Sequence, residues 1–316
     1  MVSILSSKRF SSVTWPSDPA FKPERRREIG MSAKMHNPGL FLAFGSSIVY
    51  CVLNVGLRFQ LDGSLTVWGI LVVRGLVGLA VLGLAAKLLK KDLLGRNRNM
   101  LLAVGLGTFL STVFVVLAIG NIPLYQALVM LYLYPALTVP LNYFINSVKV
   151  RPETVFWVAA AFAGCVILIW PDSAAGLQVG VYHLAGLAGA LFYALSLVLG
   201  TRLGEGNCGL EPIFYYSLWA FFGALAAIFI FGEPTGLKDP AAWGASLVLG
   251  LLALTSLLMA YAALRWLLPF KVGIVGSLEV FGGALSSWLI FDDPITIRAV
   301  IGGLIILGVA FRLRRS

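Results

Sequence analysis

The chain has 316 residues, of which 59% are hydrophobic and only 12% are charged. Soluble domains carry about 25% charged residues, so this composition and a mean hydropathy of +0.90 predict an integral membrane protein. The formal net charge of +10 does not indicate a nucleic-acid partner, because the basic residues lie in an N-terminal tail and at the ends of apolar segments. The lipid bilayer is the expected partner instead.

The N-terminal tail, residues 1–38, is rich in Ser, Pro and Arg and contains the run Glu24–Arg27. This composition predicts a disordered segment, and its basic residues predict a cytoplasmic location. The first residues lack the sustained apolar core of a signal peptide, so we expect none. Met31 and Met35 are alternative translation starts.

Ten apolar segments follow the tail, with short connections between them. Long unbroken apolar runs favour helices, because the strands of a membrane barrel alternate in polarity. The predicted fold class is therefore an all-α polytopic membrane protein with ten transmembrane helices. The segments lie at 39–57, 65–86, 100–119, 123–145, 153–170, 181–201, 211–231, 243–264, 271–291 and 295–312.

The distribution of Lys and Arg predicts the orientation of these helices. Twenty of the 24 basic residues lie in the tail, the C-terminus and the loops on one side, whereas three lie on the other: Arg58, Lys238 and Arg298. The side that is richer in Lys and Arg is normally cytoplasmic. Both termini are therefore expected in the cytoplasm, which an even number of crossings requires.

An internal repeat is visible at an offset of 144–145 residues. Each half has five segments, so the second half must enter the membrane with the opposite orientation, as in many secondary transporters. We therefore predict two inverted five-helix repeats, residues 39–170 and 181–312. The matched positions are Gly45 with Gly189, Gly56 with Gly200, Arg58 with Arg202, Gly78 with Gly223, Gly105 with Gly250, and Ser111 with Ser256.

Polar side chains recur at helical spacing in several segments. Such stripes are commonly explained by close helix packing and interhelical hydrogen bonds. Because these stripes lie in corresponding helices of the two halves, a shared polar cavity is the alternative. The candidate lining residues are Tyr50 and Asn54 in the first segment, Tyr134 and Thr138 in the fourth, Tyr193 and Ser196 in the sixth, and Trp219 in the seventh.

Two charged residues, Glu279 and Arg74, lie well inside apolar segments. A charge at the centre of a membrane helix costs about 2.5–3.5 kcal/mol on insertion scales, so it faces protein or water rather than lipid. The two residues could form a purely structural pair. Alternatively, Glu279 exchanges a proton for a ligand amine, and Arg74 holds a carboxylate. In the repeat alignment Glu279 corresponds to Tyr134 and Arg74 to Trp219, so each half contributes one charge.

Several catalytic motifs are absent from the sequence. It has no Gly-Lys dipeptide for a phosphate-binding loop, and neither HExxH nor GxSxG occurs. Cys51, Cys165 and Cys208 are scattered without a CxxC pair, so no metal site is expected. The prediction is a protein that is not an enzyme and carries no cofactor, while coupling to protons or another ion stays open.

The stretch SLEVFGGALSSWLIFDDPITIRAVIGGLIILGV, which begins at Ser277, resembles the EamA-type branch of the drug/metabolite transporter superfamily. Glu279 stands at the family's first Glu, Asp293–Thr296 at its turn, and Gly302, Gly303 and Gly308 in its glycine-rich last helix. Arg74 also suits the family. The chain departs from the pattern at Val280, where the family usually has proline, and at 146–151, which lack an acidic turn.

The resemblance implies a permease, and in particular an exporter, of small organic metabolites such as amino acids or of drugs. It implies alternating access in a bacterial inner membrane, with last-helix glycines that permit a homodimer. One alternative is a nucleotide-sugar or sugar-phosphate carrier, which should have more basic residues in its cavity. Alternatives from other classes are a membrane-embedded enzyme subunit and a passive channel.

Overall fold

The computed structural model describes residues 38–63, 65–90, 92–95, 97–147, 152–169, 180–200, 203, 210–232, 240–263, 275–276, 278–293 and 295–313. All regular structure within these ranges is helical, and no strand occurs in them. The predicted disordered tail lies outside the described residues, apart from Pro38.

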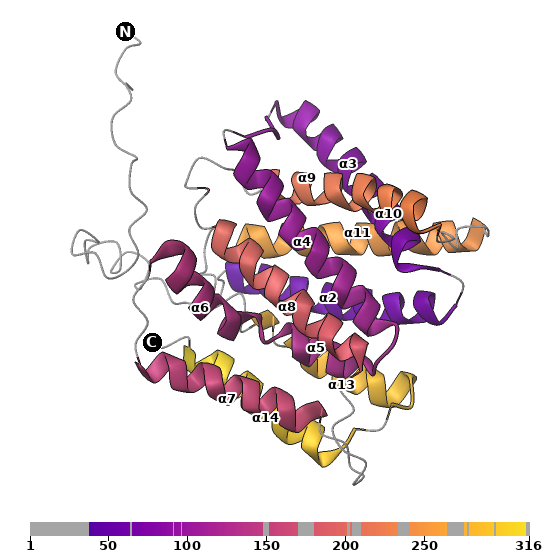
Figure 1. Cartoon of the computed structure of the whole chain (residues 1–316). Coiled ribbons are helices and arrows are strands. Elements are labelled where there is room, and N and C mark those ends of the chain that lie inside the picture. Colours follow the sequence, from indigo (N-terminus) through magenta and orange to yellow (C-terminus); the bar gives the residue numbers. More distant parts are fainter. Residues whose placement is uncertain are drawn as a thin grey trace.

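A helix occupies each of the ten predicted segments (Figure 1). Those of the first half are α2 (Pro38–Asp62), α3 (Val67–Leu89), α4 (Arg98–Ile119), α5 (Leu124–Leu131), α6 (Tyr134–Asn146) and α7 (Pro152–Ile169). Those of the second are α8 (Val181–Gly200), α9 (Glu211–Leu218), η2 (Trp219–Gly223), α10 (Ala224–Phe231), α11 (Pro240–Ala263), α13 (Leu278–Ile290) and α14 (Ile297–Leu313).

Seven helical stretches of the described chain are long and apolar enough to cross a membrane. They are α2, α3, α4, α5 with α6, α8, α9 through α10, and α11. The helices α13 and α14 are shorter than these seven stretches, and α7 has a shorter apolar part. The prediction of a polytopic all-α membrane protein is therefore confirmed, whereas ten crossings in two inverted repeats stay a prediction.

Two of the predicted continuous helices are interrupted. α5 ends at Leu131 and α6 begins at Tyr134 with Pro135 in its first turn, where proline is tolerated but the preceding helix cannot continue through it. The segment 211–231 contains the π-helical turn η2. At this turn α3 comes so close that a Cβ atom on Gly75 would lie 2.3 Å from the backbone nitrogen of Phe221.

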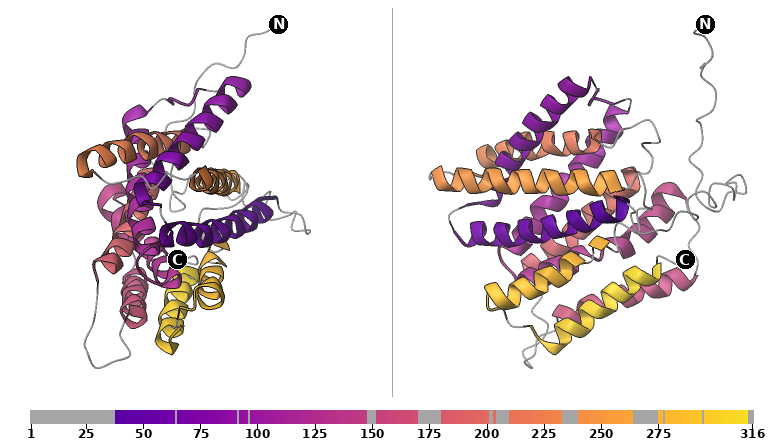
Figure 2. Two further views of the ribbon diagram at one scale, coloured as in Figure 1. Left: turned by 90° about the vertical axis from the view of Figure 1, so that its right-hand side faces the viewer. Right: turned by 180° about the vertical axis from the view of Figure 1, so that it is seen from behind.

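Helices from the two halves of the chain pack against each other (Figure 2). α4 packs against α8 and α9, while α11 packs against α2 and α3. α7 and α14 pack against each other and form one edge of the molecule. In the same views α2 and α11 lie between α3 and α13.

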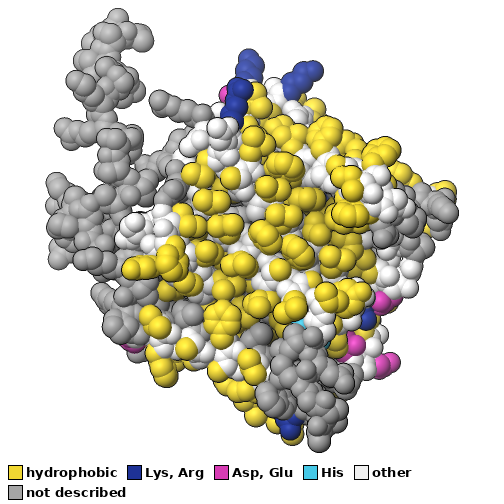
Figure 3. All heavy atoms as spheres, viewed as in Figure 1, with side chains coloured by type: hydrophobic (Ala, Val, Ile, Leu, Met, Phe, Trp, Pro, Cys, Tyr) yellow, Lys and Arg dark blue, Asp and Glu magenta, His cyan; other side chains and the backbone are white. Residues whose placement is uncertain are grey.

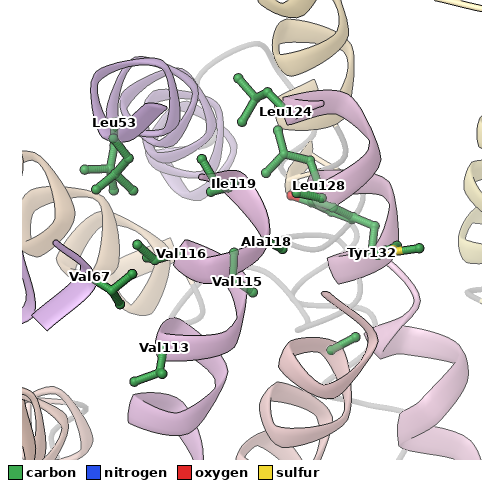
Figure 4. Close-up of a cluster of buried hydrophobic side chains, with 14 of the residues drawn as sticks. Leu53, Val67, Val113, Val115, Val116, Ala118, Ile119, Leu124, Leu128 and Tyr132 are labelled. Atoms are coloured by element: carbon green, nitrogen blue, oxygen red, sulfur yellow. The ribbon is translucent and has the colours of Figure 1, made fainter. Parts of the chain in front are cut away.

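Part of the largest hydrophobic core, which extends over most of the helices, lies where α2, α4 and α5 meet (Figure 4). Leu53, Ile119, Leu124 and Leu128 converge there and are almost completely buried. Inside a membrane such packing stabilises the fold through close van der Waals contact rather than through exclusion of water. This core fixes the C-terminal end of α5, and with it Tyr132, beside α13.

The outer surface carries a broad apolar face (Figure 3). Large apolar side chains are exposed on several helices, for example Phe41, Phe144 and Phe229 at 77%, 78% and 84%. In the view of Figure 3 the charged side chains lie near the margins of the apolar face. A water-soluble monomer rarely exposes a contiguous apolar patch of this extent. The face is therefore the lipid-contacting surface of an integral membrane protein.

Candidate functional site

The carboxylate of Glu279 lies in the first turn of α13 and is only 7% exposed. Asn54 of α2 donates a hydrogen bond from Nδ2 to Glu279 Oε1 at 2.5 Å. The hydroxyl of Tyr132, which directly follows α5, donates to Glu279 Oε2 at 3.1 Å. Both carboxylate oxygens are thus hydrogen-bonded by residues of the first half of the chain, so the site lies between the two halves.

The hydroxyl of Tyr132 has a second acceptor, the backbone oxygen of Gly276. A phenol carries a single proton, so it cannot fully donate to Gly276 and to Glu279 at once. If Glu279 is protonated, its carboxyl group donates to Tyr132, and Tyr132 donates to Gly276. The arrangement can therefore accommodate Glu279 with or without a bound proton.

Aromatic rings extend the site toward α8. The rings of Tyr132 and Tyr134 are 5.9 Å apart, and that of Tyr134 meets the ring of Tyr193 edge-on at 4.8 Å. Ser196 donates from Oγ to the backbone oxygen of Tyr193 at 3.1 Å and accepts from the hydroxyl of Thr108 at 3.2 Å. Four predicted site residues, Asn54, Glu279, Tyr134 and Tyr193, therefore belong to one cluster, whereas Ser196 supports its edge.

Arg74 lies in a different place, at a small cavity between α3, α9 and α11. It is 7% exposed, and its Nε atom has no hydrogen-bond partner among the described residues. Glu279 accepts its hydrogen bonds from Asn54 and Tyr132, and no ion pair between Arg74 and Glu279 occurs among the described residues. The predicted pairing of Arg74 with Glu279 is thus not formed in this conformation, and α2 and α11 lie between their helices (Figure 1).

The other predicted site residues lie near the Glu279 cluster or near the cavity of Arg74. Trp219 donates from Nε1 to the backbone oxygen of Leu102 at 3.0 Å and does not line the cavity of Arg74. Tyr216, one turn earlier, lines it instead. Tyr50 is half-buried against the main core, and Thr138 lies one turn after Tyr134 in α6, also half-buried.

Arg58 joins the ends of three helices. Its guanidinium donates to the backbone oxygens of Ile119 and Ile122 at 2.5 and 2.9 Å and pairs with Asp62 at 3.2 Å. It also lies 5.9 Å from the ring centroid of Phe291, just beyond α13. The ends of α2, α4 and α13 are therefore held together at this side of the Glu279 cluster.

Tyr132 was not among the residues selected from the sequence. The helical spacing that selected Tyr134 and Thr138 assumes one continuous helix, whereas the break before α6 brings Tyr132 to Glu279. The Tyr134-Pro135 dipeptide is the signal that could have located this break.

The comparisons with known proteins concern the second half most directly. Residues 181–314 match the model of the EamA-like transporter family, which is part of the drug/metabolite transporter superfamily and whose members are transporters. No curated protein matches the chain. A solved structure, described only as the crystal structure of a protein, is 19% identical, has a TM-score of 0.59, and covers 89% of this chain and 98% of its own. At this identity the likeness concerns the fold alone.

Proposed function

We propose that this chain, whose residues 181–314 belong to the EamA-like transporter family, is a secondary active transporter that exports small organic metabolites, such as amino acids, or drugs. The observation that carries the proposal is the buried carboxylate of Glu279, which α2 and the end of α5 contact from the opposite half of the chain. Ionisable groups buried in membrane helices mark substrate or ion pathways. Transporter sites typically lie at repeat interfaces beside discontinuous helices.

The helix contacts support the division into two inverted repeats, residues 39–170 and 181–312. Under the repeat offset, the pair of α4 and α8 corresponds to the pair of α11 and α2. Two matched glycines lie at these contacts: a Cβ on Gly45 would be 2.3 Å from Met259, and one on Gly189 would be 2.6 Å from Val115. α6 and α13 also begin at positions that differ by 144 residues, Tyr134 and Leu278.

The Glu279 cluster suits a ligand with an amine. A carboxylate attracts a cationic nitrogen, and the faces of tyrosine rings add cation–π attraction. In the proposed cycle Glu279 releases a proton when it binds the amine, and Asn54 and Tyr132 hold the carboxylate in place in both states. Because the cluster is buried, a ligand can reach it only after helices separate, for example after the contacts of Arg58 at the ends of α2, α4 and α13 are broken.

We place the transporter in a bacterial inner membrane with both termini in the cytoplasm. The positive-inside distribution supports this orientation, and the start of α2 and the end of α14 lie on the same side of the molecule (Figure 2). Most of the basic residues behind this proposal, including Arg202, Lys238 and Lys271, lie outside the described residues.

Reconstitution into proteoliposomes tests the proposal. A thermal-shift screen of amino acids and organic amines first selects a ligand, and its counterflow and its uptake driven by a pH gradient are then measured. We expect saturable counterflow for the wild type and for the control Glu153→Gln, which changes an exposed acid. Proton-driven uptake should be lost in Glu279→Gln, because an amide cannot bind and release the proton that the proposed cycle exchanges.

Flux that neither saturates nor shows counterflow would indicate a channel. Equal proton-driven uptake by the wild type and Glu279→Gln would remove Glu279 from the coupling mechanism.

A further inference from the structure

The cavity beside Arg74 contains two buried polar atoms that have no hydrogen-bond partner among the described residues. They are Nε of Arg74 on α3 and the hydroxyl oxygen of Tyr216 on α9. Tyr216 is 4% exposed and Arg74 is 7% exposed, so bulk water does not solvate them freely. An unsatisfied buried polar group typically costs about 1–3 kcal/mol, and more when it is charged.

The guanidinium of Arg74 gives this cavity a positive charge, and no salt bridge to another described residue balances it. A guanidinium stays protonated in proteins, and none of the residues that line the cavity is acidic. Glu211, the acidic residue of α9, is not among them. A buried charge without a partner is strongly unfavourable, and an anion from outside would supply the missing partner.

We propose that this cavity is a binding site for a small monovalent anion, a halide or a carboxylate group, which accepts hydrogen bonds from Arg74 and Tyr216. The two donors come from different helices and line one cavity, so a single acceptor can satisfy both.

The size of the cavity limits the ligand. Its volume of about 10 Å³ is close to the least that holds one water molecule, so it admits one small group rather than a phosphate or a sugar. Two glycines, Gly78 and Gly250, belong to its lining, and neighbouring helices pack closely against both, because added Cβ atoms would meet Ser217 and Val77. A Cβ on Gly250 would lie 3.5 Å from the Cα atom of Arg74.

The anion site is separate from the Glu279 cluster. Its lining residues come from α3, α9 and α11, whereas Glu279 contacts α2 and the end of α5. The proposal therefore does not depend on transport or on proton exchange at Glu279. Without a bound anion, two hydrogen-bond donors between α3, α9 and α11 would stay unsatisfied. We therefore expect the bound anion to stabilise this part of the fold.

Thermal unfolding of the full-length protein in zwitterionic nanodiscs tests the site. Sodium chloride or sodium formate replaces sodium gluconate at constant ionic strength, because gluconate is too large for the cavity. We expect a saturable rise in Tm that is absent in Arg74→Gln and needs about tenfold more anion in Tyr216→Phe. The matched control is Tyr215→Phe, because the hydroxyl of Tyr215 already donates to the backbone oxygen of Leu94.

The two anions distinguish the sources of the ligand. A response to chloride but not to formate assigns the site to a halide, and a response to formate alone assigns it to the carboxylate of an organic ligand. Equal Tm values in all three salts, or the same saturable rise in Arg74→Gln, would overturn the proposal. If Arg74→Gln does not fold, Tyr216→Phe decides the question, because an unchanged anion dependence in that variant also contradicts the site.

Discussion

Glu279 and Arg74 are equally buried, each with 7% of its surface exposed, yet their surroundings differ. Both oxygens of Glu279 accept hydrogen bonds, from Asn54 and Tyr132. Arg74 instead has an unpartnered Nε beside a cavity, together with the unpartnered hydroxyl of Tyr216. Burial alone therefore does not indicate what a membrane charge does. A partnered charge must exchange its partners to act, whereas an unpartnered one can bind a ligand directly.

The largest expected effect comes from disrupting the close contact between η2 and α3, the helix that carries Arg74. In Gly75→Ala the new Cβ atom would lie 2.3 Å from the backbone nitrogen of Phe221, and a backbone atom cannot move aside as a side chain can. We expect the free energy of unfolding to fall by about 1–3 kcal/mol, the usual cost of overpacking. SDS-titrated unfolding in mixed micelles measures this change.

The matched control for this variant is Gly83→Ala in the same helix, where nothing lies within 4 Å of the added Cβ. It should be neutral, or stabilising by up to about 1 kcal/mol, because alanine favours a helix over glycine. A Gly75→Ala protein as stable as Gly83→Ala would show that α3 and η2 are not in this close contact.

A smaller effect is expected from removing one partner of Glu279. Tyr132→Phe deletes the hydroxyl that contacts both Glu279 and Gly276 and keeps the ring. Loss of about 1–2 kcal/mol of hydrogen bonding corresponds to a roughly 5–30-fold decrease in proton-driven uptake in proteoliposomes. Tyr143→Phe, which alters an exposed tyrosine, is the control. Uptake that is reduced equally in both variants would mean that the hydroxyl of Tyr132 has no specific role.

The smallest effect is expected at Asp62, the ion-pair partner of Arg58. Asp62→Asn should change stability by no more than about 0.5 kcal/mol, because the carboxylate of Asp62 is 46% exposed and exposed ion pairs contribute little. Arg58→Gln should cost more, about 1–2 kcal/mol, because it removes the donors to Ile119 and Ile122.

Arg58 also provides a control for the proposed anion site at Arg74. The chloride-dependent rise in Tm should be the same in Arg58→Gln and the wild type, because the guanidinium of Arg58 already has partners. An anion response that disappears with Arg58 would contradict the assignment to Arg74.

The sequence predicts the helical character and the membrane location well, because long apolar runs are strong local signals. It also predicts that Asn54 and Glu279 are functional candidates, and the structure brings these two residues into contact. Two of the glycines that the repeat offset matches, Gly45 and Gly189, lie at close helix contacts, whereas nothing lies within 4 Å of a Cβ added to Gly200.

The details that decide the site depend on tertiary packing. The break between α5 and α6 moves Tyr132, rather than Tyr134, to the carboxylate. The separation of Arg74 from Glu279 depends on how α2 and α11 pack, and no pattern within one segment encodes this. Helical spacing identifies which residues share a face of a helix, but it does not identify the neighbour that the face meets.

The central claim is that Glu279 and Arg74 belong to two separate sites. A double-mutant cycle tests it: the free energy of unfolding in nanodisc-derived mixed micelles is measured for the wild type, Glu279→Gln, Arg74→Gln and the double variant. Changes at sites without shared partners add to within about 0.5 kcal/mol, and we predict this additivity. A coupling energy above about 1 kcal/mol would mean that the two charges share one site and would contradict the account.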